Sequence, residues 1–307
     1  MRGLDEARKL YDEYGAPMLR ERFGDWEGRI AVGLAGHGSE CFGYDDELSR
    51  DHDFPQGFCL WLDDETDRAI GVPLARAYRA LPFGAAAERS AMSEASRGVQ
   101  RIRAFYRRYT GCDGAPESVE QWLSLPSWAL AEATNGAVFR DDAGTFSAVR
   151  QAILTGMPED VRLKKLAARV ITMAQAGQYN YPRCVRHGEF GAAMLAMGEF
   201  VSAACAAVYL LNRRHMPYYK WQLRGMESLE RLGSLREALE FLLTAANDEE
   251  GRVLKSAVIE DICVTLVREL RAQQLSRGSW DYLEPHAFEI AARIQSPELR
   301  AMHIMEG

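Results

Sequence analysis

The sequence has few cysteines and no long apolar run. Its 6 cysteines include no Cys-x-x-Cys pair, so we expect free thiols in a reducing cytosol and no zinc site. No stretch of about 18 consecutive apolar residues occurs, which argues against a membrane-spanning helix. The opening residues, MRGLDEARKLYDEYG, contain acids and no apolar core, so we expect no secretory signal. The sequence therefore predicts a cytoplasmic protein that does not enter a membrane.

An excess of basic charge is also lacking. The 37 Lys and Arg residues face 44 Asp and Glu residues, which gives a net charge of −7 over 307 residues. This balance disfavours nucleic acid as a partner, although it does not exclude a local basic site. Hydrophobic residues make up 47% and charged residues 26% of the chain, which excludes a disordered or collagen-like protein. The length predicts roughly two domains.

Strand signals are confined to about the first 110 residues. A helix over 4–24 precedes a short buried strand at 29–35, and a second strand runs from Asp51 to Leu62. Acidic residues at Asp63 and just after it predict the start of a helix, because they stabilise its positive end. A third strand is expected at 99–102. This part reads as a small α/β unit.

After about residue 119 the apolar pattern becomes mainly helical. The clearest helices are expected over 161–176, 188–213, 222–246 and 253–273. We therefore predict an α+β protein, in which a small mixed-sheet head over 1–135 is followed by a mainly helical domain over 136–307 that closes the cleft. The boundary between them could fall anywhere from 112 to 156.

One short stretch combines two features that suit phosphate chemistry. Gly38-Ser39 lies at the predicted strand-to-helix turn, where glycine allows close approach of a ligand and free N–H groups can bind phosphate oxygens. Asp51 and Asp53 are two residues apart on a strand, so both carboxylates point to the same side and can share one or two Mg²⁺ ions. His37, beside the turn, is expected to pack or hydrogen-bond within the fold.

This stretch resembles the DNA polymerase β-type nucleotidyltransferase superfamily, including its antibiotic nucleotidyltransferases. The resemblance rests on Gly38-Ser39-Glu-Cys-Phe-Gly43 and on Ser49-Arg-Asp51-His-Asp53, with the 11 residues 40–50 between Ser39 and Asp51. It implies a nucleotidyltransferase head that binds a nucleoside triphosphate, with ATP favoured, together with two Mg²⁺ ions. It also implies that Asp51 and Asp53 are the catalytic metal ligands and that Gly38 and Ser39 hold phosphates. Ser49 could contact a phosphate or cap the turn before Asp51.

A second resemblance covers the helical part. The segments Gln175-Ala-Gly-Gln-Tyr-Asn-Tyr-Pro-Arg183 and Leu211-Asn-Arg-Arg-His-Met-Pro-Tyr-Tyr-Lys-Trp221 are similar to a bacterial family catalogued only as a domain of unknown function. In that family a helical segment of this kind follows a nucleotidyltransferase head. Here the basic candidates for contacting the nucleotide are Arg183, Arg186 and Lys220. Each could equally be a solvated surface charge.

The predicted reaction moves a nucleoside monophosphate to an acceptor hydroxyl. We favour a small molecule as the acceptor over a protein side chain or an RNA end. The superfamily usually adds a third carboxylate on a later strand, and the strand expected at 99–102 has none. The acids near that strand fit no motif: Glu88, Glu94, Glu117, Glu120 and Glu132. The alternative is therefore a catalytically inactive nucleotide-binding sensor or interaction module.

Overall fold

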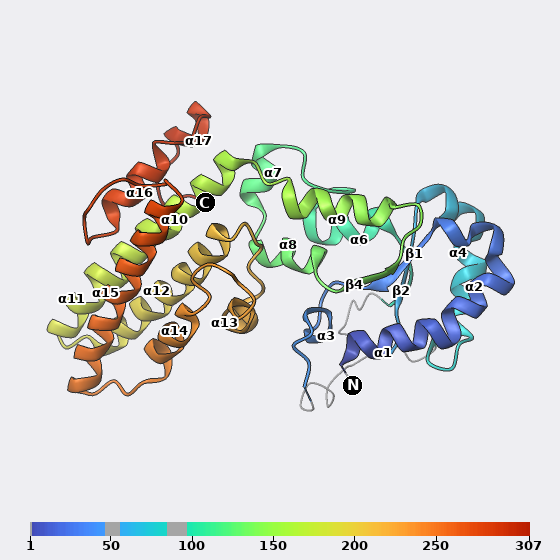
Figure 1. The fold of residues 1–307 in the computed structure, drawn as a ribbon, viewed down its shortest axis with the longest axis horizontal. Helices are drawn as coiled ribbons and strands as arrows, with labels where there is room; N and C mark the ends of the chain where they lie inside the picture. The colour runs from blue at the N-terminus through green and yellow to red at the C-terminus, as the bar shows by residue number, and fades with distance from the viewer. Residues whose placement is uncertain (1, 47–55, 85–96) are drawn as a thin grey trace. The chain divides into compact units, whose positions relative to one another are not determined.

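The computed structural model describes residues 2–46, 56–84 and 97–307 (Figure 1). The chain forms two compact units, each built from two segments. We call residues 1–117 with 129–156 the head unit, and residues 118–128 with 157–307 the helical unit. The architecture is α+β as predicted, with a small mixed sheet in the head unit and mainly helices in the C-terminal part. The division into domains at residue 135 stays a prediction.

The head unit contains a four-stranded sheet in the order β3-β2-β1-β4. Its strands are β1 (Ile30–Leu34), β2 (Cys59–Leu62), β3 (Gly98–Arg101) and β4 (Ala137–Arg140). β2 and β3 are parallel, whereas β1 is antiparallel to both β2 and β4. The strands expected near residues 29, 58 and 99 are thus confirmed, and the predicted part of the second strand at 51–55 lies outside the described residues. β4 was not predicted, because its four residues are all half-buried and show no alternation.

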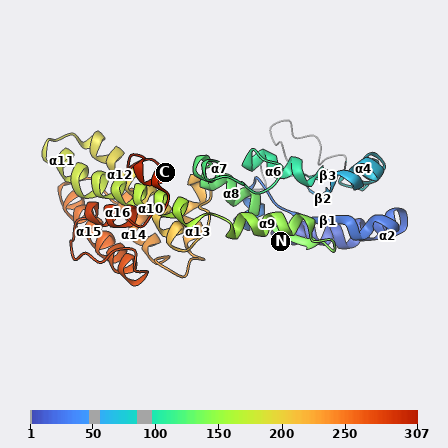
Figure 2. The ribbon, with the colours of Figure 1, turned by 90° about the horizontal axis from the view of Figure 1, so that it is seen from above.

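Aromatic packing joins β2 to the helices that cover it. Trp61, which is fully buried, stacks on Phe146 of α9 (Thr145–Thr155) with 3.9 Å between ring centroids. Its edge also contacts Phe105 of α6 (Ile102–Thr110) at 5.5 Å. Figure 2 shows α4 (Asp64–Arg79) and α6 near β3, in agreement with their contacts. This core packs β2 against α6 and α9.

The helix expected over 4–24 is confirmed, and the run is not broken at Gly15 or Pro17. It consists of α1 (Gly3–Leu10), a π-helical turn (Tyr11–Gly15) and α2 (Ala16–Phe23). A Cβ atom at Gly15 would lie 2.5 Å from Cζ of Phe58, so glycine permits close approach of this run to the residue before β2. The expected helix start at residue 63 is also confirmed, because the carboxylate of Asp63 accepts a hydrogen bond from Thr66 N at 2.8 Å.

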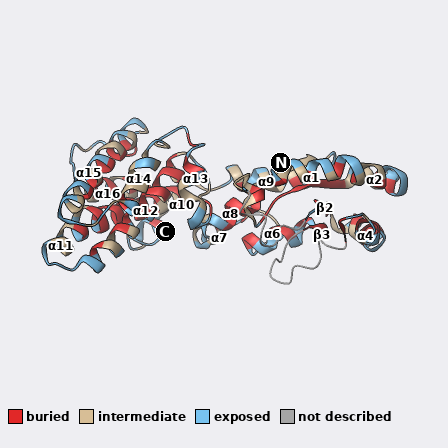
Figure 3. Ribbon diagram, turned by 90° about the horizontal axis from the view of Figure 1, so that it is seen from below, coloured by how far each residue is buried: buried red, intermediate tan, exposed pale blue. Residues whose placement is uncertain are grey.

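The helical unit is built around α12. Its helices are α7 (Val119–Ser124), α10 (Glu159–Met173), α11 (Tyr181–Arg186), α12 (Phe190–Leu211), α13 (Gln222–Met226), α14 (Leu235–Thr244), α15 (Glu249–Ala272), α16 (Glu284–Ala291) and α17 (Pro297–Ala301). Figure 3 shows the buried residues gathered along α10, α12 and α15. The single helix expected over 222–246 is wrong. The chain turns between α13 and α14, where Leu232 has a φ of +57°.

In the described part of the chain, α12 is the one helix long and apolar enough to cross a membrane. However, 56% of its apolar window is buried inside the protein. The helix packs against α10, α11 and α14, which is the environment of a core helix. The expectation that no helix spans a membrane is compatible with this burial.

Candidate functional site

The predicted site is described in part. Gly38 and Ser39 are described, whereas Ser49, Asp51 and Asp53 lie outside the described residues. The geometry of the Asp51–Asp53 pair therefore stays a prediction. The described part of the site consists of the turn after β1 and the side chains that surround it.

The turn requires glycine at two positions. Gly36 and Gly38 have φ values of +113° and +120°, in a region that other residues rarely adopt. Ser39 then begins α3 (Ser39–Phe42). A Cβ atom on Gly38 would lie 2.3 Å from a carboxylate oxygen of Glu40, so there is no room for a side chain. Gly36 is buried, whereas Gly38 and Ser39 are half-buried. That Gly38 and Ser39 bind phosphate stays a prediction.

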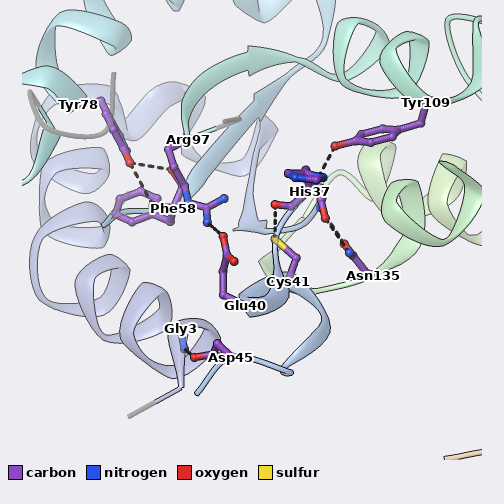
Figure 4. Close-up of polar contacts among 11 residues, drawn as sticks. Gly3, His37, Glu40, Cys41, Asp45, Phe58, Tyr78, Arg97, Tyr109 and Asn135 are labelled. Atoms are coloured by element: carbon purple, nitrogen blue, oxygen red, sulfur yellow. Dashed lines mark hydrogen bonds and ion pairs between the residues drawn. The ribbon is translucent and has the colours of Figure 1, made fainter. Parts of the chain in front are cut away.

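Two side chains from distant parts of the head unit hold the turn in place (Figure 4). Asn135 accepts a hydrogen bond from Gly36 N and donates one to Gly36 O, both at 2.7 Å. The hydroxyl of Tyr109 accepts a hydrogen bond from His37 N at 3.1 Å. Because these groups bind main-chain atoms, they fix the path of the backbone rather than the side chains. The turn is therefore preorganised.

A buried ion pair lies directly beneath the turn. Arg97 donates to the carboxylate of Glu40 at 2.5 Å, and their side chains are only 2% and 8% exposed (Figure 4). The pair neutralises both charges, so it adds no net charge to the turn. Burial raises the pKa of the nearby Cys59 thiol to about 11, although Arg97 opposes the increase. Burial also raises the pKa of the Cys41 thiol, so both thiols are protonated and neither is a nucleophile near pH 7.

Glu132 is the carboxylate that the fold brings to this turn. It lies on α8 (Ser127–Thr134), and its Oε1 atom is 3.2 Å from Nδ1 of His37. The His37 side chain is 74% exposed, whereas that of Glu132 is 7% exposed. A buried acid thus orients an imidazole that reaches solvent. The sequence contained no signal for this pair, because the residues are 95 positions apart.

Of the other acids predicted near the turn, Asp45 forms a hydrogen bond, and Asp51 and Asp53 lie outside the described residues. Asp45 accepts a hydrogen bond from Gly3 N at 2.8 Å, and its second oxygen is buried with no partner among the described residues. The described residues contain no group of three or more His, Cys, Asp or Glu that could hold a metal ion. A metal site of the predicted kind therefore depends on Asp51 and Asp53.

The basic candidates in the helical unit do not form one group. Arg183 and Arg186 are exposed on α11, just before α12 begins. Lys220 is exposed beyond the far end of α12, with Nζ 5.2 Å from the ring centroid of Trp221 (Figure 1). Since α12 has 22 residues, its length of about 33 Å separates the two locations. They cannot all contact one phosphate group.

Comparison with protein families gives one match. The model of a domain of unknown function (DUF4037) matches residues 122–222. This range contains both segments, 175–183 and 211–221, on which the resemblance of the helical part rests. It begins in α7, includes β4 and ends after the short 3₁₀ helix Tyr219–Trp221. Neither the curated proteins nor the solved structures give a match.

Proposed function

We propose that the head unit is a Mg²⁺-dependent nucleotidyltransferase. The observation that carries this proposal is the turn from Gly36 to Ser39, which has two glycines at positive φ and is held by Asn135 and Tyr109. Rigid main-chain N–H groups at such a turn suit the binding of phosphate oxygens. The mixed sheet that presents the turn is compatible with the superfamily that the sequence resembles.

The donor would be a nucleoside triphosphate, with Gly38 and Ser39 binding its β- and γ-phosphates. Asp51 and Asp53 would hold Mg²⁺, which when bound neutralises charge on the phosphates. The oxygen of an acceptor hydroxyl forms a bond to the α-phosphorus as the bond to the pyrophosphate breaks. The protein contributes mainly positioning and electrostatic stabilisation.

His37 is the described group best suited to accept the proton of the acceptor hydroxyl. It is largely exposed, it directly precedes Gly38, and the buried carboxylate of Glu132 lies at its Nδ1 atom. An acid at one ring nitrogen fixes the orientation and tautomer of an imidazole and supports its protonated form. The pair of His37 and Glu132 would supply a general base in place of the third carboxylate, which β3 does not carry.

The function is tested by pyrophosphate release from each ribonucleoside triphosphate in the presence of Mg²⁺, a panel of acceptors and a cell lysate. We expect release with the full chain and its loss in the Asp51→Asn, Asp53→Asn double variant. Asp25→Asn, which neutralises an exposed acid outside the site, is the matched control. Retention of both nucleotide binding and transfer in the double variant would contradict the proposal.

His37→Asn separates chemistry from binding. We expect this variant to bind the triphosphate normally and to release pyrophosphate about 10²–10⁴-fold more slowly, because it retains the turn but lacks a base. Glu132→Gln should also slow release, because it removes the acid that orients His37. An unchanged rate in both variants would exclude His37 and Glu132 from the reaction.

A second candidate function is a nucleotide-binding module that no longer catalyses. It is favoured by β3, which carries Gln100 and no acid. The side-chain amide of Gln100 is buried and has no partner among the described residues. This module would bind the triphosphate, as calorimetry can show, with no release for any acceptor.

The helical unit would select the acceptor, with a small hydroxylated molecule favoured. Lys220 beside Trp221 offers a cation and a ring at one location, whereas Arg183 and Arg186 offer two cations at another. Lys220→Gln should therefore change the KM for the acceptor or the donor independently of Arg183→Gln. Equal effects of the two variants would indicate general electrostatic attraction instead.

A further inference from the structure

The helix α6 carries a basic pocket on the head unit. The pocket has a volume of about 410 Å³ and is lined by Arg101, Arg103, Ala104, Arg107 and Arg108. This volume lies within the range of sites that bind small ligands, about 300–1,000 Å³. Four arginines around one alanine make a site for an anion, because the guanidinium group remains charged at any physiological pH.

Three of the four arginines form ion pairs with acids, and two of these three keep donors for a ligand. The acidic partners are Asp67 for Arg101, Asp64 for Arg103 and Asp113 for Arg107. Arg101 and Arg103 make these contacts through Nε, at 2.6 and 3.0 Å. Within the described chain, the Nη atoms of both residues have no protein partner. A guanidinium fork of this kind matches two oxygens of a phosphate group.

We propose that this pocket binds the phosphate group of a small phosphate monoester. A compact dianion can lie between the arginines. An extended polyanion such as RNA would also meet the acids at the rim, Asp64, Asp67 and Asp113, and a chain whose net charge is −7. Ala104 also lines the pocket, and its short side chain leaves room for the organic part of the ligand.

The pocket is connected to the turn after β1 through α6. Arg108 directly precedes Tyr109, whose hydroxyl binds His37 N. A phosphate bound here would thus lie on the helix that supports the turn. The proposal does not depend on nucleotide transfer, since neither a nucleotide nor Mg²⁺ enters its test.

The test is calorimetric titration of the full chain with phenyl phosphate and with inorganic phosphate, at about pH 8, where both are dianions. We expect phenyl phosphate to bind more tightly, because the pocket is larger than a phosphate group. The Arg103→Gln, Arg107→Gln double variant should weaken binding at least about tenfold. Asp64→Asn should tighten it, because it frees a donor and removes a negative charge.

Two further variants distinguish a pocket from diffuse surface charge. Ala104→Leu changes no charge but adds a larger side chain to the lining of the pocket, and we expect it to weaken binding as much as the arginine double variant does. Arg76→Gln removes an exposed arginine from α4, away from the pocket, and should leave binding unchanged. The circular dichroism of every variant is compared with that of the original chain.

Three results would overturn the proposal. The first is normal binding in Ala104→Leu, and the second is the absence of binding at millimolar phenyl phosphate. The third is tighter binding of a single-stranded RNA oligonucleotide, with an affinity that falls steeply with salt, as expected when several phosphates are contacted.

Discussion

Buried charge serves different purposes in the two units. In the head unit, the buried cation Arg97 is paired with the buried anion Glu40, directly beneath the candidate phosphate-binding turn. In the helical unit, the buried cation Lys164 is 2% exposed and donates to two main-chain oxygens, Met302 O at 2.9 Å and His303 O at 2.8 Å. Lys164 thus binds the segment at 302–303 to α10, whereas the pair of Arg97 and Glu40 supports a turn.

This difference indicates which polar groups concern function. A lysine that binds carbonyl groups near a chain end stabilises the fold and requires no ligand. A buried ion pair gives little net stability, because desolvation of both charges offsets their attraction. The Glu40 carboxylate lies next to Gly38, in the space that a side chain at this position would need. This location indicates that the ion pair shapes the turn. The comparison can be tested by breaking each kind of contact.

The largest effect is expected from Arg97→Leu. This substitution leaves the Glu40 carboxylate buried without its partner, which should lower the free energy of unfolding by about 3–5 kcal/mol. Urea unfolding followed by circular dichroism measures the change. The double variant Glu40→Leu, Arg97→Leu removes both charges and should recover most of the loss. If the single and double variants are equally unstable, the side-chain volume rather than the charge pair matters here.

A smaller effect is expected from Gly38→Ala. The positive φ and the contact with the Glu40 carboxylate both oppose a Cβ atom, so the free energy of unfolding should fall by about 1–3 kcal/mol. Triphosphate binding should weaken as well, because the turn must shift. Gly28→Ala is the matched control, since its Cβ would meet no atom within 4 Å and stability should hardly change. Equal melting temperatures for the two variants would contradict this account of the turn.

The sequence predicted those parts of the fold whose signals are local. The buried run of β1, the acids at Asp63 that begin α4 and the apolar periodicity of α12 each occupy one short window. β4 was missed because a strand of four half-buried residues has no such pattern. The same holds for the turn between α13 and α14, at which Leu232 takes a positive φ.

The candidate site was predictable only where its residues are neighbours in the chain. Gly38 and Ser39 form a motif that can be read directly. The contacts that shape the turn join distant residues, with 57 positions between Arg97 and Glu40 and 99 between Asn135 and Gly36. No spacing rule relates such residues. Only the fold shows that Glu132, one of several acids with no motif, lies beside His37.

The smallest effect is expected from a partly exposed ion pair in the helical unit, in which Arg162 is buried and Glu159 is half-exposed. Hydrogen bonding by Arg162, with help from Arg213, lowers the pKa of the half-exposed Glu159 to about 2. The stabilisation is therefore present above the usual pKa of about 4.5 and is lost as the pH falls toward 2. Because Glu159 is solvated, we expect less than about 1 kcal/mol. Melting temperatures between pH 6 and pH 2 should fall less in Glu159→Gln than in Glu237→Gln, a control at an exposed acid with no ion pair among the described residues. Identical pH dependence in the two variants would mean that this ion pair contributes nothing to the stability of the helical unit.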